Sequence, residues 1–310
     1  MLLAGVDVGG TNIGVGLVDA DHQVHDRTKE DTPTSVQALV AQVSRMVGAL
    51  DGRLDAVGIG IPGIINDDRV VQAPNLEGWD ADTDVAAQIS DALGIPVSLV
   101  NDAQCGLLGE WVAGAGKGSD FLFGVWLGTG VGAGMVLDGK GYDGSGGGSG
   151  EFGHVVVRPG GARCGCGRRG CIEAYAGRRM MTESARAMQA AGRRTSLFEH
   201  QEKRGKAKAT SGVWAAALAD GDEVVTEILD EAVEALGIGV ANVLNLLDLD
   251  RVVVGGGMAS RLGQDFADRI GRAARPHSVR KVPDGLVVVA GLGDDSGIVG
   301  AAEVARSKLH

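Results

Sequence analysis

The chain has 310 residues, enough for two domains of ordinary size, and 44% of them are hydrophobic, so a sizeable core is available. Its 29 basic and 40 acidic residues give a formal net charge of −11, which disfavours nucleic-acid binding because that function needs clustered Lys and Arg to neutralise phosphates. The first residues lack a signal-peptide pattern, no apolar run approaches the ~18 residues of a membrane span, and only four cysteines are present, so we expect a cytoplasmic protein with no membrane partner.

The chain begins with an apolar run interrupted by glycines. Residues 5–19 read GVDVGGTNIGVGLVD, which predicts a β-hairpin whose turn contains Gly9, Gly10, Thr11 and Asn12. A hairpin turn by itself does not need this much glycine. The additional glycines expose backbone N–H groups, which together with the threonine hydroxyl can bind an anion such as a phosphate.

Alternating helices and strands follow the first hairpin. Apolar spacing predicts helices over residues 34–50 and 84–93, and short apolar runs predict strands at 56–61 and 97–100. This alternation is typical of an α/β domain.

Asn101 and Asp102 directly follow the strand at 97–100. Residues at the carboxyl ends of strands in an open α/β sheet face the ligand crevice, so Asp102 is a candidate general base and Asn101 a neighbour that orients it. The same pair is also a common helix N-cap, which is the structural alternative. The sequence leaves open how the next side chains, Gln104 and Cys105, affect the pocket.

A second hairpin repeats the first. Residues 124–138 read GVWLGTGVGAGMVLD and align with residues 5–19 without a gap. The turn of this copy contains Thr129, Gly130 and Gly132, a second candidate phosphate loop. Two unrelated flexible turns are the alternative, but the duplication favours two related α/β domains with one phosphate loop each.

One difference between the two copies is informative. The first copy has Asp7 where the second has Trp126. An aspartate at a strand end beside a phosphate loop lacks a counter-charge, and a hydrated Mg²⁺ would supply one. A capping or turn aspartate is the alternative.

A metal-binding pattern occupies the middle of the chain. It consists of one imidazole and three thiolates: His154, Cys164, Cys166 and Cys171. This is the complete tetrahedral ligand set of a structural zinc site, with no position open for water. A group of buried or disulfide-bonded cysteines is the alternative, although cysteines separated by one residue pair poorly as a disulfide. Glu151 and Glu173 flank the set, so the metal would hold two carboxylates beside it.

The last third of the chain continues the alternation. The predicted elements are helices over residues 172–190, 222–247 and 297–308, and strands at 251–254 and 286–290. Residues 192–212 are polar and basic, which predicts a solvated loop. A turn of three glycines, Gly255, Gly256 and Gly257, follows the strand at 251–254.

Together these residues resemble the ROK family of sugar kinases, within the actin/hexokinase superfamily, and especially its bacterial glucokinases. The matching motifs are VDVGGTNI near the start, IPGIIN at 61–66, APNLEGW at 73–79, VNDA at 100–103, LGTGVGAG at 127–134, GEFGH at 150–154, CGCGRRGCIEAYA at 164–176, VVVGGG at 252–257 and GAAEVA at 300–305. The resemblance covers nearly the whole chain, and GEFGH followed by this cysteine spacing is its most specific part.

The resemblance implies an α/β fold with two actin/hexokinase-like (RNase H-like) domains flanking a cleft, and a structural zinc loop. The smaller domain would comprise residues 1–118 with 298–310, and the larger one residues 119–297 with the zinc loop. The glycine-rich run at 144–150 is then a candidate hinge for closure. Ala133 departs from the family, since it replaces a glycine common in the second loop.

The resemblance also implies residue roles. Asp102 matches the catalytic base that activates the sugar hydroxyl, normally the 6-hydroxyl. The positions that match sugar-binding residues are Asn101, Asp102, Glu151, His154, Glu173, Asn75 and Gly63. The positions that match phosphate-binding residues are Gly9, Gly10, Thr11, Asn12, Thr129, Gly130 and Gly132. Gly255, Gly256 and Gly257 match the turn near the nucleoside, and Asp7 is similar to the residue near Mg²⁺.

The activity that the resemblance implies is an ATP-dependent hexose kinase, a glucokinase that uses Mg²⁺, contains structural zinc and forms a homodimer or homotetramer. An N-acetylhexosamine, mannose, fructose or allose kinase of the same family is the alternative, and polyphosphate or ADP could replace ATP. A sugar-responsive transcription regulator fits less well, because it would carry a helix-turn-helix before the first phosphate strand, which here starts by Leu2.

Overall fold

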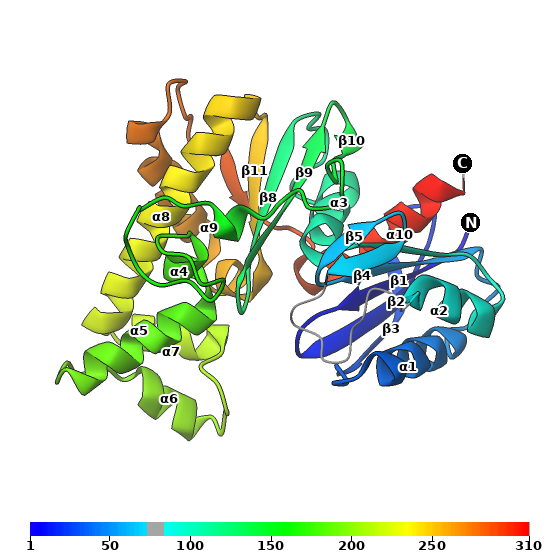
Figure 1. The fold of residues 1–310 in the computed structure, drawn as a ribbon, viewed down its shortest axis with the longest axis horizontal. Helices are drawn as coiled ribbons and strands as arrows, with labels where there is room; N and C mark the ends of the chain where they lie inside the picture. The colour runs from blue at the N-terminus through cyan, green and yellow to red at the C-terminus, as the bar shows by residue number, and fades with distance from the viewer. Residues whose placement is uncertain (73–83, 310) are drawn as a thin grey trace. The chain divides into compact units, whose positions relative to one another are not determined.

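The computed structural model describes residues 1–72 and 84–309, and the chain forms two compact units (Figure 1). The first unit comprises Met1–Gly124, Gly134–Gly150 and Gly291–His310, and the second comprises Val125–Ala133 and Glu151–Ala290. The predicted domain boundaries, residues 1–118 with 298–310 and residues 119–297, stay a prediction.

A five-stranded mixed sheet forms the centre of the first unit. Its strands, in spatial order, are β3 (Val24–Asp31), β2 (Asn12–Val18), β1 (Leu3–Val8), β4 (Ala56–Ile61) and β7 (Val97–Asn101). The three strands from β3 to β1 are antiparallel, whereas β1, β4 and β7 are parallel. The helices of this unit are α1 (Val36–Gly48), α2 (Val85–Leu93), α3 (Asp102–Ala113) and α10 (Ser296–Lys308). A short two-stranded sheet of β5 (Ile64–Asn66) and β6 (Arg69–Gln72) completes the unit.

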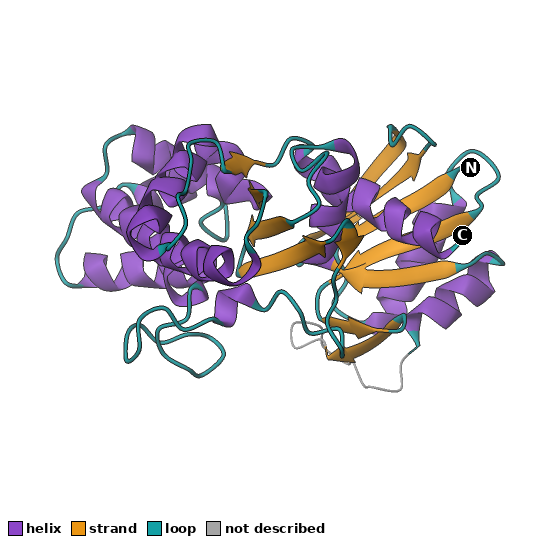
Figure 2. Ribbon diagram, turned by 90° about the horizontal axis from the view of Figure 1, so that it is seen from above, coloured by secondary structure: helices purple, strands orange, loops and turns teal. Residues whose placement is uncertain are grey.

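The side chains of β1 alternate between the two faces of this sheet and are mostly buried on both, because helices cover both faces (Figure 2). Ala4, Val6 and Val8 pack in the core that α1 and α2 share with the sheet. Leu3 points the other way and packs against α10 at Ile298. The two-residue period of a strand explains this division, and it places Asp7 on the same face as Leu3, toward α10.

Helix α10 lies so close to the sheet that glycines are required opposite it. A Cβ atom on Gly58 would lie 1.7 Å from the carbonyl oxygen of Ala301, and one on Gly5 would lie 1.9 Å from that of Ile298. Both distances are far below any van der Waals contact, so helix backbone packs directly on strand backbone. This close approach explains glycines that have no role in a turn.

Glu110, near the end of α3, is a fully buried carboxylate that fixes two connecting segments. It accepts hydrogen bonds from the backbone N–H groups of Ala115, Gly291 and Leu292, each at 2.8 Å, and from the Ser296 hydroxyl at 2.6 Å. Buried carboxylates are tolerated when several such donors surround them. Glu110 therefore joins the segment that leaves α3 to the segment that enters α10.

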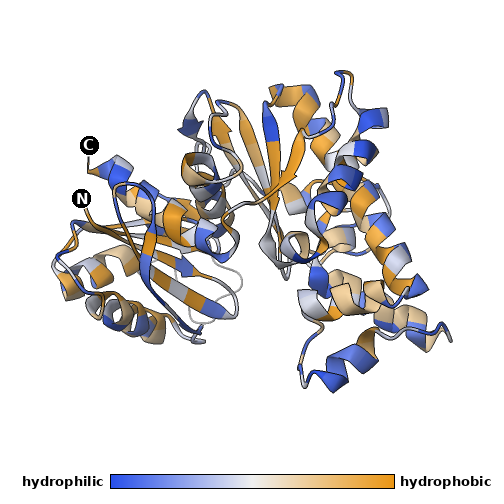
Figure 3. Ribbon diagram, turned by 180° about the vertical axis from the view of Figure 1, so that it is seen from behind, coloured by the Kyte–Doolittle hydropathy of each residue, from blue (hydrophilic) through white to orange (hydrophobic). Residues whose placement is uncertain are grey.

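A second five-stranded sheet repeats the order of the first. Its strands, in spatial order, are β10 (Lys140–Gly141), β9 (Val131–Leu137), β8 (Leu122–Leu127), β11 (Arg251–Gly255) and β12 (Val287–Val289). In both sheets the chain order of the strands is third, second, first, fourth, fifth. Hydrophobic residues occupy many of the strand positions (Figure 3). The predicted α/β class and both predicted hairpins, β1–β2 and β8–β9, are confirmed.

The helices of the second unit pack around the long helix α8. They are α4 (Glu173–Ala176), α5 (Arg178–Ala190), α6 (Leu197–Lys203), α7 (Ser211–Ala219), α8 (Glu223–Leu247) and α9 (Gly256–Ala274), with 3₁₀ turns at Phe152–His154, Arg275–His277 and, in the first unit, Gly293–Asp295. No described helix is both long and apolar enough to cross a lipid bilayer.

Two predicted elements differ from the structure. The helix expected over residues 172–190 is broken at Gly177, because the N–H of Arg178 donates to Gly128 O instead of continuing the helix. The solvated loop expected over residues 192–212 contains α6, which is anchored by buried Leu197. The stretch is mostly polar, so its sequence shows no apolar periodicity that would predict the helix.

We expect Gly58→Ala to destabilise the chain by about 3 kcal/mol, because the new methyl group would overlap the Ala301 carbonyl and force α10 off the sheet. Urea unfolding followed by circular dichroism would measure the loss.

Gly48→Ala is the matched control. Gly48 lies in α1, and the nearest atom to its added Cβ would be 3.9 Å away, so this change should cost nothing and can add up to ~1 kcal/mol of helix propensity. Equal effects of the two substitutions would contradict direct backbone packing of α10.

Candidate functional site

The first glycine loop, residues 9–12, is held by its own backbone and by Thr32. Gly9 N donates to Asn12 O at 2.9 Å, and the Thr32 hydroxyl donates to Gly9 O at 2.6 Å. Thr32 N donates to Thr11 O at 2.9 Å. Gly10 and Thr11 are exposed at the tip of the hairpin, so their N–H groups and the Thr11 hydroxyl are accessible to a ligand.

Asp7, the last residue but one of β1, lies against the start of α10. A Cβ atom on Gly297 would be 2.5 Å from the Asp7 carboxyl carbon, so only glycine fits there. Burial, followed by the negative charges of Asp102 and Asp294, raises the pKa of Asp7 to about 7. Two neighbouring half-buried carboxylates favour a cation, and carboxylate oxygens are the ligands that Mg²⁺ prefers. The residues present therefore fit a magnesium ion.

Asp102 is the first residue of α3, at the carboxyl end of β7. Its Oδ1 accepts the Ala103 N–H at 2.9 Å. The positive end of the α3 dipole favours a negative charge at this position. Asp102 thus lies in the same unit as Asp7 and the first glycine loop, at the strand end where the sequence places it, and its role as general base stays a prediction.

Asn101 caps a helix, which is the structural alternative that the sequence left open. Its Oδ1 accepts the N–H groups of Ala103 at 2.9 Å and Gln104 at 3.1 Å, so Asn101 is the N-cap of α3. Its Nδ2 donates to Gly63 O at 2.9 Å. Asn101 therefore positions Asp102 and Gly63 through the backbone, and its sugar contact stays a prediction. Asn75, predicted in the same group, lies outside the described residues.

Gln104 and Cys105, whose effects the sequence left open, are buried and bonded to other elements. The Gln104 amide pairs with Met135 of β9 in both directions: Nε2 donates to Met135 O at 2.9 Å, and Met135 N donates to Oε1 at 2.7 Å. The Cys105 thiol donates to Gly297 O at 2.9 Å, and burial raises its pKa well above the usual range. Both side chains fix α3 rather than face a ligand.

In the second unit, the predicted zinc ligands converge. Their ligand atoms all lie within 4.8 Å of one another: His154, Cys164, Cys166 and Cys171. The Cys166 and Cys171 sulfurs are 3.8 Å apart, and Cys164 Sγ is 3.8 Å from His154 Nδ1. Sulfurs that share a tetrahedral zinc with 2.3 Å bonds lie about 3.8 Å apart, whereas a disulfide needs ~2 Å. The geometry fits zinc and excludes the disulfide alternative.

The charge balance of this cluster also favours a metal ion. Burial raises the pKa of the Cys164 thiol to about 12 and also raises that of Cys171. The backbone N–H of Arg168 holds the pKa of Cys166 down to about 6. Thiolates crowded in a partly buried site are stabilised by a coordinated cation, which deprotonates its ligands outright.

Glu151 and His154 form the outer edge of the cluster. His154 ends the 3₁₀ turn that begins after Glu151, and its N–H donates to Glu151 O at 3.0 Å. With Nδ1 toward the sulfurs, Nε2 faces the Glu151 carboxylate at 3.9 Å. That separation exceeds a direct hydrogen bond.

Glu173, the first residue of α4, connects the cluster to the second glycine loop, residues 128–132. One carboxylate oxygen accepts the Val131 N–H at 3.1 Å, and the other lies 3.9 Å from Cys164 Sγ. A Cβ atom on Gly130 would lie 2.3 Å from Oε2, so a larger residue there would displace the Glu173 carboxylate. Thr129 O accepts the Arg179 N–H at 3.1 Å. The cluster and the loop therefore hold each other in place.

The three-glycine turn lies where β11 ends and α9 begins. Gly256 has φ +83°, and its added Cβ would lie 2.6 Å from Leu127 O, so the turn packs against β8. A Cβ atom on Gly257 would lie 2.7 Å from the Ser211 hydroxyl at the start of α7. Arg178, which the sequence analysis did not single out, donates to that hydroxyl and to Thr129.

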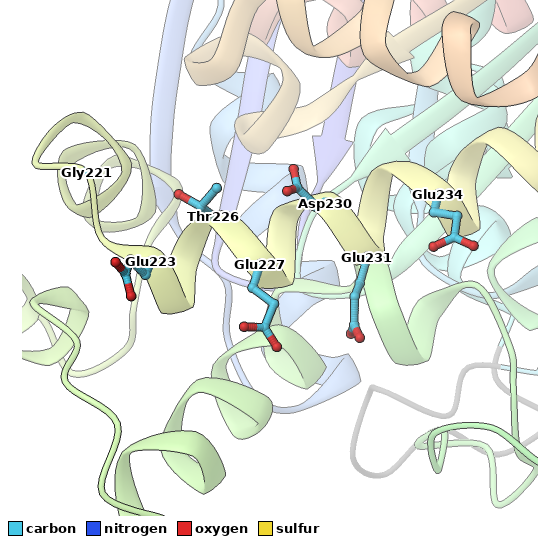
Figure 4. Close-up of a pocket in the computed structure, with 7 residues that line it drawn as sticks. All are labelled: Gly221, Glu223, Thr226, Glu227, Asp230, Glu231 and Glu234. Carbon is cyan, nitrogen blue, oxygen red and sulfur yellow. The ribbon is translucent and has the colours of Figure 1, made fainter.

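A separate hollow lies along α8 and is lined mainly by acidic residues (Figure 4). Two of these carboxylates form ion pairs at 2.5 Å, Glu227 with Arg193 and Glu234 with Arg158. Its lining includes none of the predicted site residues. We therefore do not place the functional site there.

Three comparisons with known proteins match this chain over nearly its full length to the same family. The sequence profile of the ROK family matches residues 3–308. The glucokinase of Streptomyces coelicolor is 34% identical over 316 residues, 98% of each chain. An N-acetylmannosamine kinase of Escherichia coli is 28% identical over 312 residues, 100% of each chain. The crystal structure of a ROK family glucokinase from Streptomyces griseus in complex with glucose and AMPPNP is 31% identical, with a TM-score of 0.85, and the match covers 99% of this chain and 100% of that one.

We expect the purified protein to contain one zinc ion per chain and Cys171→Ser to lose it. Because Cys171 is a buried member of the cluster, the loss should lower the melting temperature by about 5 °C or more. Metal analysis by mass spectrometry and a thermal melt would measure both effects.

Cys105→Ser is the control, since Cys105 is a buried cysteine outside the cluster and serine keeps its hydrogen bond to Gly297 O. Full zinc content in Cys171→Ser, or equal zinc loss in both variants, would contradict the assignment of the cluster.

Proposed function

This chain belongs to the ROK family, and we propose that it is an ATP-dependent hexose kinase that phosphorylates the 6-hydroxyl of glucose. Full-length similarity to a curated glucokinase and to a glucokinase structure that contains glucose and AMPPNP supports the substrate pair. The observation that carries the proposal is the position of Asp102, at the end of β7 and the start of α3, close enough to Asp7 to raise the pKa of that residue.

In this proposal Asp102 is the general base. Its carboxylate accepts the proton of the 6-hydroxyl while that oxygen attacks the γ-phosphorus of ATP and the bond to ADP breaks. Asn101 holds the start of α3 in place through two backbone N–H groups, which fixes the direction of the Asp102 side chain. Positioning matters most here, because phosphoryl transfer depends largely on orientation and charge stabilisation.

The two glycine loops would bind the phosphate oxygens through backbone N–H groups and the hydroxyls of Thr11 and Thr129. Gly255, Gly256 and Gly257 would lie near the nucleoside. Asp7 would hold Mg²⁺, which when bound neutralises charge on the transferred phosphoryl group.

The side chains beside the cysteine cluster suit the other sugar hydroxyls. With Nδ1 on zinc, His154 carries its proton on Nε2 and can donate it to a sugar oxygen, which in turn can donate to Glu151. Glu173 still has acceptor capacity beyond its bond to Val131. In this role zinc is structural: it fixes the sugar-binding side chains and takes no part in the transfer.

An N-acetylhexosamine kinase is the second candidate, because a curated N-acetylmannosamine kinase matches the whole chain at 28% identity. A coupled assay with ATP and a panel of hexoses separates the two. We expect the largest kcat/KM for glucose. A larger value for N-acetylmannosamine would select the second candidate, and no turnover with any hexose would refute both.

The expected assembly of this chain into a homodimer or homotetramer stays a prediction, which measurement of the molecular mass in solution would test.

We expect Asp102→Asn to lower kcat by about 10²–10⁴-fold, the usual contribution of a general base, while glucose still binds. Asparagine keeps the size of the side chain and can keep the hydrogen bond from Ala103 N, so the start of α3 should persist. Steady-state kinetics and a glucose titration by calorimetry would measure the two effects.

Asp91→Asn is the matched control, since it removes the same charge from an exposed position on α2 of the same unit. Substantial kcat in Asp102→Asn, or an equal loss in the control, would refute Asp102 as the base.

A further inference from the structure

Arg178 is the first residue of α5 and lies over the second glycine loop. Its Nη2 donates to the Thr129 hydroxyl at 3.3 Å, and its Nη1 donates to the Ser211 hydroxyl at 3.2 Å. Its backbone N–H donates to Gly128 O at 3.2 Å. The guanidinium is therefore fixed between the loop and the first residue of α7.

The Ser211 hydroxyl connects Arg178 to the three-glycine turn, Gly255–Gly257. Ser211 Oγ would lie 2.7 Å from a Cβ atom on Gly257, so the hydroxyl contacts the backbone at that turn. Arg178 thus spans the distance from the second glycine loop to the turn at the start of α9. Those are the two segments of this unit that the family resemblance assigns to the phosphates and the nucleoside of the donor.

No carboxylate among the described residues forms an ion pair with Arg178, whereas Arg158, Arg193 and Arg269 of the same unit each pair with a carboxylate of α8. The guanidinium donates to two neutral hydroxyls, those of Thr129 and Ser211, although it has five N–H donors. The side chain is half-buried, and burial lowers its pKa.

The surrounding backbone adds positive rather than negative potential. Arg178 stands at the first position of α5, and Ser211 at the first position of α7. Helix N-termini carry partial positive charge and disfavour a cation. A half-buried cation in such a place is costly unless an anion joins it, and arginine binds phosphate oxygens in a bidentate manner.

We propose that Arg178 is a donor-binding residue that contacts the diphosphate of ATP and ADP between Thr129 and the Gly255–Gly257 turn. This inference rests on the proposed kinase function. When the γ-phosphoryl group moves to the sugar oxygen, the electron pair of the broken bond stays on ADP, so a cation at the diphosphate stabilises the leaving group as well as the bound nucleotide.

The test compares nucleotides with and without phosphates. For Arg178→Ala we expect the Kd for ADP to rise about tenfold, while the Kd for adenosine stays unchanged, because only the charged hydrogen bonds to phosphate are lost. In turnover, KM for ATP should rise and kcat should fall, while KM for the hexose stays the same. Calorimetric titrations and steady-state kinetics of the full chain give these values.

Two further variants separate charge from structural support. Arg178→Lys keeps the cation and should recover part of the ADP affinity, whereas Arg178→Gln keeps hydrogen-bonding groups without charge and should bind ADP as weakly as the alanine variant. Recovery of ADP affinity in Arg178→Gln would overturn the proposal and assign Arg178 a structural role. Equal weakening of ADP and adenosine would overturn it in the same way.

Arg186→Ala is the matched control, because Arg186 lies on the same helix and stacks on Phe198, away from both glycine segments. An ADP Kd that rises as much in this control as in Arg178→Ala would reduce the effect to net charge and overturn the proposal. The ADP titration does not depend on the sugar. Absence of hexose turnover in the wild type would therefore refute the proposed function, whereas an unchanged ADP Kd in Arg178→Ala would refute the role of Arg178.

Discussion

The proposed site in the second unit depends on the cysteine cluster, in which three thiols and an imidazole have their ligand atoms within 4.8 Å of one another and would be held as thiolates by a coordinated cation. The cluster sits in a small core with Ala174, Tyr175 and Ala235, so it also fixes α4 on α8. From there, Glu173 reaches Val131 and fixes the second glycine loop. A metal ion bound by the cluster would thereby hold Glu173 and the second glycine loop in place without taking part in the proposed chemistry.

The two sheets have the same strand order, yet their glycine loops are supported by different interactions. The first loop is held by neutral groups, the Thr32 hydroxyl and backbone, and lies near the carboxylates of Asp7 and Asp102. The second is held by the carboxylate of Glu173 and the guanidinium of Arg178. The two loops therefore differ in charge: carboxylates lie near the first, whereas the second contacts both a carboxylate and a guanidinium.

Close backbone packing holds α10 against β1, which carries Asp7, and against α3, which begins at Asp102. Glycines at positions 5, 58 and 300 let α10 contact β1, β4 and α3 without intervening side chains. Gly297 brings the start of α10 against Asp7, and Glu110 fixes the segment before the helix. Small displacements of α10 would therefore change the surroundings of Asp7.

The sequence by itself determined the features that depend on local spacing. The two hairpins, the helices at 36–48, 85–93 and 223–247, the strand-end aspartate and the His/Cys cluster all follow from periodicity, glycine placement and ligand spacing. The tertiary structure decided what depends on contacts between distant residues. Gly177 ends α4 because Arg178 N turns to Gly128, Asn101 caps α3 while it bonds to Gly63, and Gln104 pairs with Met135. Arg178 itself looks like an ordinary helix residue in sequence; only the fold places Thr129 and Ser211 beside it and leaves its charge without a carboxylate among the described residues.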